Sequence, residues 1–238
     1  RNYTPGHSDL LTRPARGGPK EDPITVTVKS LLEAGVHFGH QTQRWNPKMA
    51  PYLFGQRAGV HIIDLEQTVG YLHEAAKQAE AVCAEGGLVL FVGTKRQGKD
   101  ALTEAATQAN MPYVTERWLG GMLTNWNTIS ERLEHFRKLA SEKESGDWER
   151  LPKKEIARKQ DQLDKLTALL AGVKEMRELP RAVFVNDVVR EDLAVREAKK
   201  LGLPVIGVVD SNADPTGIEY PIPANDDAVK AIAIVAQA

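Results

Sequence analysis

The segment with the most distinctive chemistry runs from residue 35 to residue 63 and reads GVHFGHQTQRWNPKMAPYLFGQRAGVHII. It contains no aspartate or glutamate, and it interleaves the cations Arg44, Lys48 and Arg57 with aromatic residues that include Trp45. Cations neutralise phosphates, and exposed aromatic or guanidinium planes stack on unpaired bases. The segment therefore predicts an RNA-binding surface. The alternative is that its aromatic rings pack beneath a loop and its cations are ordinary surface residues.

The same segment contains a histidine pair, His37 and His40, with the spacing H-x2-H. Two imidazoles can supply two metal ligands, but a closed zinc site takes about four, and no cysteine is nearby. We therefore expect no metal and no cofactor, with His37 and His40 as the residues to inspect for one.

A phosphate-binding loop is suggested by GTKRQGKD at residues 93–100, which follows an apolar run and precedes a helical pattern. Gly93, Gly98 and Lys99 match the pattern G-x-x-x-x-G-K. The hydroxyl residue that should follow, and that would bind magnesium, is replaced by Asp100, whose charge opposes that of a nucleotide. The motif is therefore incomplete.

Two aspartates, Asp187 and Asp210, each follow an apolar run, at the position where a doubly wound fold binds ligands. Such aspartates hold magnesium in some enzymes and form turns or helix caps in other proteins. A nucleotide-binding enzyme that uses Lys99 and Asp210 is therefore the alternative function. No nucleophile with a neighbouring base is recognisable, and no G-x-S-x-G motif occurs.

Composition indicates a folded protein of ordinary type, with 42% hydrophobic and 26% charged residues. A formal net charge of −1 excludes a uniformly basic nucleic-acid binder, so any RNA contact must come from a local concentration of cations.

The single cysteine, Cys83, excludes an internal disulfide and is expected on the buried face of a helix that begins at Leu65. No apolar run reaches the ~20 residues of a membrane helix, so neither membrane insertion nor export is expected.

Three continuous apolar runs predict strands that are buried on both faces, at residues 88–92, 182–185 and 204–209. Helical patterns follow them at about residues 97–109, 189–200 and 225–237. Alternating strands and helices predict an α/β fold with a doubly wound, Rossmann-like (flavodoxin-like) parallel sheet and flanking helices. In the last helix, we expect Asn225 to be the cap, with Asp226 and Asp227 in the first turn.

Residues 128–178 interrupt this alternation with two charged helices around a proline-containing turn. Their narrow apolar seams predict a protruding antiparallel hairpin, a coiled coil that is either a solvated spur or an RNA-contacting one. The chain thus divides into a flexible basic extension (1–25), an α/β RNA-binding domain (26–127 and 179–238) and a helical hairpin (128–178). In the first segment of the α/β domain, the sequence predicts a helix over 26–34, strands in PYLFG and VHII, and a helix over 65–83.

The N-terminal extension is rich in proline and glycine and has more basic than acidic residues. It could serve as an RNA-seeking arm, be the remnant of a targeting peptide, or take no part in function.

The chain resembles a known family, the second protein of the small ribosomal subunit, of the bacterial and organellar type. Its matching segments follow the order of the family: EAGVHFGHQTQRWNPKM (33–49), HIIDLEQT (61–68), LFVGTK (90–95), RWLGGMLTNW (117–126), LPKKE (151–155), AKKLGLPVIGVVDSNADP (198–215) and IPANDDA (222–228). Such long, ordered matches are more specific than the incomplete phosphate loop that lies among them.

The resemblance implies a structural protein without catalytic activity, in a cytoplasmic or an organellar ribosome. Its partners would be small-subunit ribosomal RNA and neighbouring proteins of the subunit, including the S-one protein that captures messenger RNA. The residues expected to contact RNA lie in the stretch from His37 to Arg57, the turn from Lys95 to Lys99, and the Arg117-Trp118 loop. They are Arg44, Trp45, Lys48, Arg57, Lys95, Arg96, Lys99, Arg117 and Trp118. A protein-binding scaffold derived from such a ribosomal protein is a third hypothesis.

Overall fold

The computed structural model describes residues 26–238, so the predicted N-terminal extension lies outside the described residues. The larger sheet comprises β4 (Val89–Val92), β5 (Tyr113–Val114), β6 (Ala182–Val185), β7 (Val205–Val209) and β8 (Tyr220–Pro223). Its strands are all parallel, in the order β5-β4-β6-β7-β8. Numbered within this sheet, the order is 2-1-3-4-5, the flavodoxin-like arrangement. The predicted Rossmann-like α/β fold is confirmed.

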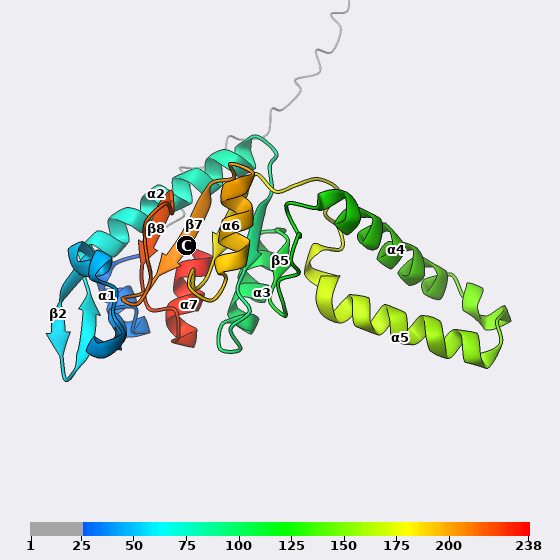
Figure 1. The fold of residues 1–238 in the computed structure, drawn as a ribbon, viewed down its shortest axis with the longest axis horizontal. Helices are drawn as coiled ribbons and strands as arrows, with labels where there is room; N and C mark the ends of the chain where they lie inside the picture. The colour runs from blue at the N-terminus through cyan, green and yellow to red at the C-terminus, as the bar shows by residue number, and fades with distance from the viewer. Residues whose placement is uncertain (1–25) are drawn as a thin grey trace, which may run out of the picture.

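Helices cover both faces of this sheet, which explains why its strands are almost continuously apolar. Along β4, Leu90 and Val92 join a cluster on one face, where α6 (Asp192–Lys200) packs. Val89 joins the cluster on the other face. That face is covered by α1 (Val28–Ala34), α2 (Leu65–Ala84), α3 (Lys99–Gln108) and α7 (Val229–Gln237). Figure 1 shows α2 and α6 on opposite sides of the sheet.

Helix α1 shows how local sequence sets the ends of an element. Thr27 precedes it and exchanges hydrogen bonds with Ser30 in a capping box. Gly35 ends the helix in the left-handed conformation, with φ 76°, which glycine adopts without a steric penalty. The helix predicted over 26–34 is therefore confirmed, with its start two residues later.

A second, smaller sheet lies beyond the β8 edge of the main sheet (Figure 1). It contains β1 (Phe38–Gln41), β2 (Leu53–Arg57) and β3 (Val60–Ile63), antiparallel and in the order β1-β3-β2. Short 3₁₀ helices at Thr42–Arg44 and Pro47–Tyr52 connect β1 to β2. A Cβ atom on Gly39 would lie 2.7 Å from the Ser211 hydroxyl, so β1 packs directly against the loop that follows β7.

The helical hairpin comprises α4 (Trp126–Glu144), a 3₁₀ turn (Asp147–Arg150), α5 (Lys153–Leu170) and a second 3₁₀ turn (Ala171–Val173). It projects from the β5 side of the sheet, opposite the β2–β3 ribbon (Figure 1). Apolar residues of both helices face each other and belong to the same cluster as the α6 face of the sheet. The antiparallel hairpin agrees with the sequence pattern, and its supercoiling stays a prediction.

The start of the last helix was predicted wrongly. Helix α7 begins at Val229, so Asp226 and Asp227 lie in the loop before it. Asn225 instead closes a turn, because its side-chain oxygen accepts hydrogen bonds from the backbone N–H groups of Asp227 and Ala228. Asp226 is buried and forms an ion pair with Lys95.

Among residues 26–238, no helix is both long enough and apolar enough to span a membrane.

Candidate nucleic-acid interface

Several of the predicted RNA-contact residues gather along the carboxyl edge of the main sheet. Arg96 lies in the loop after β4, and Arg117 lies in the loop after β5. Arg44 lies near the end of β7, because the neighbouring Asn46 N–H donates to the Ser211 carbonyl at 2.8 Å. Parallel strands end at one common edge, which is also where doubly wound folds bind their ligands.

The predicted RNA contacts include four arginines, Arg44, Arg57, Arg96 and Arg117, which we call the arginine rim. All four side chains are exposed. Within residues 26–238, no ion pair or side-chain hydrogen bond occupies any of their guanidinium groups. Arg57 lies at the end of β2, on the ribbon beyond the sheet. A planar guanidinium offers paired donors to a phosphate, so the rim suits a polyanion.

Trp45 adjoins the rim and supplies an aromatic surface. Its side chain is 38% exposed, and its ring centroid lies 4.9 Å from that of His61. One part of the ring is therefore packed and another part faces outward, as a base-stacking contact requires.

Lys95 is bound inside the protein. Its ammonium lies 2.9 Å from an Asp187 oxygen, 2.6 Å from an Asp226 oxygen and 2.7 Å from an Asp227 oxygen. Burial alone would lower the pKa of Lys95, but the three carboxylates together raise that pKa above its usual value. The charge of Lys95 is thus neutralised internally, and its side chain is only 14% exposed.

His40 extends this buried network. Its Nδ1 atom lies 3.1 Å from Asp210, and its Nε2 atom lies 3.5 Å from Asp227. The hydrogen bond to Asp210 raises the pKa of His40, while burial and neighbouring carboxylates raise the pKa of Asp226 to about 7. Ligand atoms of His40, Asp210 and Asp226 lie within 4.8 Å of one another, close enough to hold a metal ion, and His37 is outside this group.

The other two lysines predicted to bind RNA also have carboxylate partners. The Lys48 ammonium lies 2.7 Å from Asp214 and 3.1 Å from the Thr216 hydroxyl. The hydrogen bond from Lys48 lowers the pKa of Asp214 to about 2. Lys99 pairs with Glu116 at the surface. We call Lys48, Lys95 and Lys99 the paired lysines.

Trp118 lies in the core, contrary to its expected role as an RNA contact. Its side chain is 8% exposed, and its indole N–H donates to Glu197 at 3.1 Å. The ring cannot stack on a base unless the loop opens. Trp118 directly follows Arg117 in the sequence, and this is why both were predicted to contact RNA. In the fold, the Arg117 side chain is exposed and the Trp118 side chain is buried.

Glu197 was not identified from the sequence as a functional residue. It is buried, and it accepts hydrogen bonds from the loop that contains Arg117. The signal that could have found it is helical spacing, because Glu197 falls on the same face of α6 as the buried Ala194 and Ala198. A glutamate on an apolar helix face needs donors from another element.

Side chains pack closely against the glycines of the phosphate-loop pattern. A Cβ on Gly93 would lie 2.3 Å from the Leu102 side chain, and one on Gly98 would lie 3.1 Å from the Ile232 side chain. Lys99 is held by Glu116 and Asp210 by His40, so the two residues of the enzyme hypothesis have different partners.

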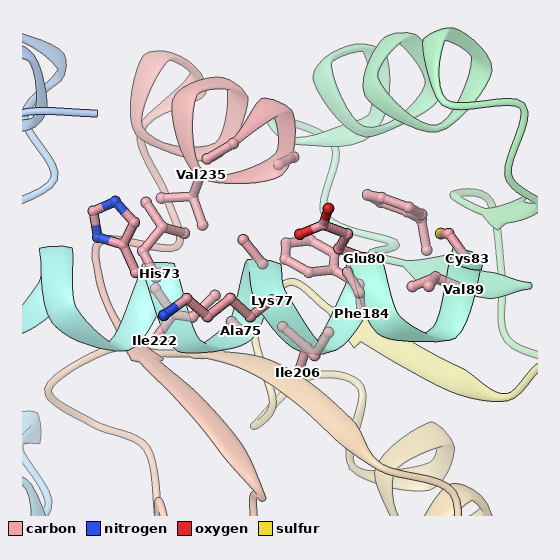
Figure 2. A pocket seen from close by; sticks show the side chains of 16 residues that line it. His73, Ala75, Lys77, Glu80, Cys83, Val89, Phe184, Ile206, Ile222 and Val235 are labelled. Carbon is pink, nitrogen blue, oxygen red and sulfur yellow. The ribbon is translucent and has the colours of Figure 1, made fainter. Parts of the chain in front are cut away.

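The cavity in Figure 2, about 620 Å³ in volume, lies between α2, α7 and the sheet, on the face opposite α6. Its lining is mostly apolar and includes Phe184, Ile206 and Val235, while the polar ends of Lys77 and Glu80 come from α2 (Figure 2). None of the predicted RNA-contact residues lines it.

Cys83 lies at this cavity and is exposed, so its prediction as a core residue is wrong. The buried positions of α2 include Leu72, Ala75 and Val82. At the end of α2 the buried position is therefore Val82, one residue before Cys83, which the apolar pattern of the sequence had predicted to be buried.

Residues 31–238 match a family model described as Ribosomal protein S2. The chain belongs to the ribosomal protein S2 family. It is 56% identical over 208 residues to the small ribosomal subunit protein uS2 of Rhodospirillum rubrum, covering 87% of this chain and 79% of that relative. The uS2 protein of Koribacter versatilis is 51% identical over 211 residues, which cover 89% of this chain and 70% of that relative.

Membership of the S2 family confirms the resemblance seen in the sequence segments. Proteins of this family are structural and not enzymatic, so the chain is a ribosomal protein without catalytic activity. The nucleotide-enzyme hypothesis based on Lys99 and Asp210 is therefore rejected.

Proposed function

We propose that this S2-family chain is a constituent of the small ribosomal subunit and binds small-subunit ribosomal RNA through the arginine rim. The observation that supports the proposal is the exposure of Arg44, Arg57, Arg96 and Arg117 without an ionic partner among the described residues. The names of the relatives, small ribosomal subunit protein uS2, favour the same assignment.

Charge distribution explains how a molecule of net charge −1 can bind RNA. Five acidic side chains near the carboxyl edge, those of Asp187, Asp210, Asp214, Asp226 and Glu116, are bound to the paired lysines or to His40, which limits their repulsion of phosphates. The rim arginines keep their charge and their donors for the ligand, and neutralised phosphates release their counterions. In this arrangement the α/β domain, assigned to 26–127 and 179–238, is the RNA-binding part. The hairpin at 128–178 is free to contact RNA or protein.

The proposal is tested by replacing all four rim arginines with alanine and measuring incorporation into small subunits that lack the homologous protein. We expect the variant to fold and to be lost from the particle fraction on sedimentation at physiological salt, because the phosphate contacts are removed together. Circular dichroism provides the folding control. Normal incorporation of the folded variant would contradict the proposal.

The hypothesis of a protein-binding scaffold is separated by cross-linking to RNA in cells. A small-subunit RNA contact yields cross-links at or beside the arginine rim, whereas a scaffold yields none. Complete absence of RNA cross-links from an incorporated chain would favour the scaffold.

We also propose that the chain helps to anchor the S-one protein through exposed aromatic side chains of the small sheet. Phe54, on β2, is 81% exposed, and Phe38, on β1, is 50% exposed. Aromatic side chains are frequent anchors of protein interfaces because they bury a large area at low entropic cost. Phe54→Ala should leave incorporation of the chain unchanged and lower the S-one content of purified subunits, measured by mass spectrometry. Unchanged S-one content in both Phe54→Ala and Phe38→Ala would reject this role.

A further inference from the structure

Helix α6 has a buried glutamate that fastens the loop after β5. The Glu197 carboxylate accepts five hydrogen bonds from this loop. Its Oε1 atom accepts from the Trp118 indole and the Gly121 N–H, and its Oε2 atom accepts from the Leu123 N–H and from the N–H and hydroxyl of Thr124. Arg117 immediately precedes this bound segment and is exposed.

A second glutamate, at the N-terminus of the same helix, fastens the loop after β4. Glu191 is buried, and its Oε1 atom accepts from the Thr94 N–H and the Thr94 hydroxyl, both at 2.7 Å. The guanidinium of Arg190 also donates to Thr94, at 3.1 Å to its hydroxyl. Thr94 lies two residues before the exposed Arg96.

We propose that Glu191 and Glu197 are positioning residues that orient Arg96 and Arg117, respectively, for binding RNA. The inference rests on the proposed function of the arginine rim and assigns its geometry to one helix of nine residues, α6. Without these carboxylates, the loop after β5 would leave three backbone N–H groups without an acceptor, and the loop after β4 would leave one. A loop without these bonds samples many conformations. Prior ordering of a loop reduces the entropy lost when its arginine binds a phosphate.

The carboxylate suits this task because its two oxygens accept several bonds at once. Although burial alone would raise the pKa of Glu197, the hydrogen bonds from Thr124, Trp118, Gly121 and Leu123 lower the pKa below its usual value. The group is therefore ionised at neutral pH, and bonds to an ionised acceptor are stronger than neutral ones. Glutamine has the same shape but brings an amide NH₂ that would face N–H donors.

The test is a double-mutant cycle measured by filter binding to full-length small-subunit ribosomal RNA transcribed in vitro. Arg117→Ala should weaken binding about tenfold, as expected for the loss of one charge-assisted contact. Glu197→Gln should weaken it by a similar factor, yet change it less than about twofold when Arg117 is already alanine. Glu191→Gln and Arg96→Ala should show the same dependence.

Two controls separate positioning from general damage. Glu197→Gln combined with Arg96→Ala should give effects that multiply, because that pair does not share a loop. Asp192→Asn removes one negative charge from an exposed ion pair of the same helix, so it matches the charge change of Glu197→Gln and should not weaken RNA binding. Hydrogen exchange at Gly121, Leu123 and Thr124 should accelerate in Glu197→Gln and stay unchanged in Asp192→Asn.

The outcomes distinguish the two proposals. If Arg96→Ala and Arg117→Ala leave RNA affinity unchanged, the proposed function fails. If they weaken binding but the Glu197 effect multiplies with that of Arg117, Glu197 is not a positioning residue. Should Glu197→Gln fail to fold, Thr124→Val removes a single hydroxyl donor of the same cluster and enters the cycle in its place.

Discussion

The paired lysines and the arginine rim lie in neighbouring parts of the molecule and carry the same charge, yet the fold treats them differently. Lys95 contacts three carboxylates, and Lys48 and Lys99 contact one each. The four rim arginines contact no carboxylate among the described residues. The first group links loops through ion pairs, and the second group is the one that we propose to bind an external anion.

The chemistry of the two side chains accounts for the division. An ammonium is a compact charge with three donors, which matches the three carboxylates around Lys95. A guanidinium is planar and weakly hydrated, and it presents paired donors to a phosphate or a flat surface to a base. Under the proposed function, internally paired lysines contribute little to RNA binding, so a count of cations in the sequence overestimates the proposed RNA-binding surface.

The largest effect is expected from Lys95→Met. Removing the ammonium leaves Asp187 and Asp226 buried without their cation, which should lower the free energy of unfolding by about 3–5 kcal/mol. Urea denaturation followed by circular dichroism measures this change.

Lys99→Met is the matched control, because its ion pair with Glu116 is at the surface and its loss should change the free energy of unfolding far less. A stable Lys95→Met protein with impaired RNA binding would reverse the assignment of Lys95 and remove the distinction between the two groups.

We expect a smaller effect on the salt dependence of RNA binding. It is measured by comparing two variants of equal charge. Arg96→Ala with Arg117→Ala should reduce the slope of log affinity against log salt by roughly 0.7–0.9 for each lost phosphate contact. Lys48→Ala with Lys99→Ala also removes two positive charges but should change the slope by less than half as much. Equal slopes for the two variants would show that internal pairing does not decide which cations contact RNA.

The smallest effect is a pH dependence from the Lys48–Asp214 pair. The pKa of Asp214 falls from 3.8 to about 2 in the folded protein, so its stabilising contribution is present above pH ~4 and is lost as the pH falls toward 2. Because both side chains are about half exposed, the loss should stay below about 1 kcal/mol. Unfolding in urea at pH 5 and pH 3 should therefore differ less for Asp214→Asn than for the natural chain. An equal difference in both proteins would assign the acid sensitivity to other carboxylates.

Much of the fold was predictable because its signals are local. The run AVFV became β6 at the predicted residues, and the apolar seams of α4 and α5 indicated the hairpin. Two of the missed strands, β5 and β8, have weak local signals. β5 has two residues, and β8 contains two prolines, which cannot donate to a sheet. Both strands form because they pair with β4 and β7, respectively.

The sequence indicated which residue types the candidate site contains, but it did not indicate which side chains pair with one another inside the protein. The acid-free stretch directed attention to Arg44 and Arg57, which are exposed, and their contact with RNA stays a prediction. No residue near Lys95 in the sequence indicates its ion pair with Asp226, because Asp226 is 131 residues away. The bond between Trp118 and Glu197 likewise spans 79 residues.

By itself, the sequence determined the alternation of strands and helices, the protruding hairpin, the family and the identity of the cations that could meet RNA, because these depend on neighbouring residues. Tertiary structure alone decided which cations are neutralised inside the protein and which remain exposed, and it placed Trp118 in the core. The physical reason is that an ion pair or a buried hydrogen bond depends on distance in space, and the loops of a parallel sheet bring together residues that are far apart in the chain.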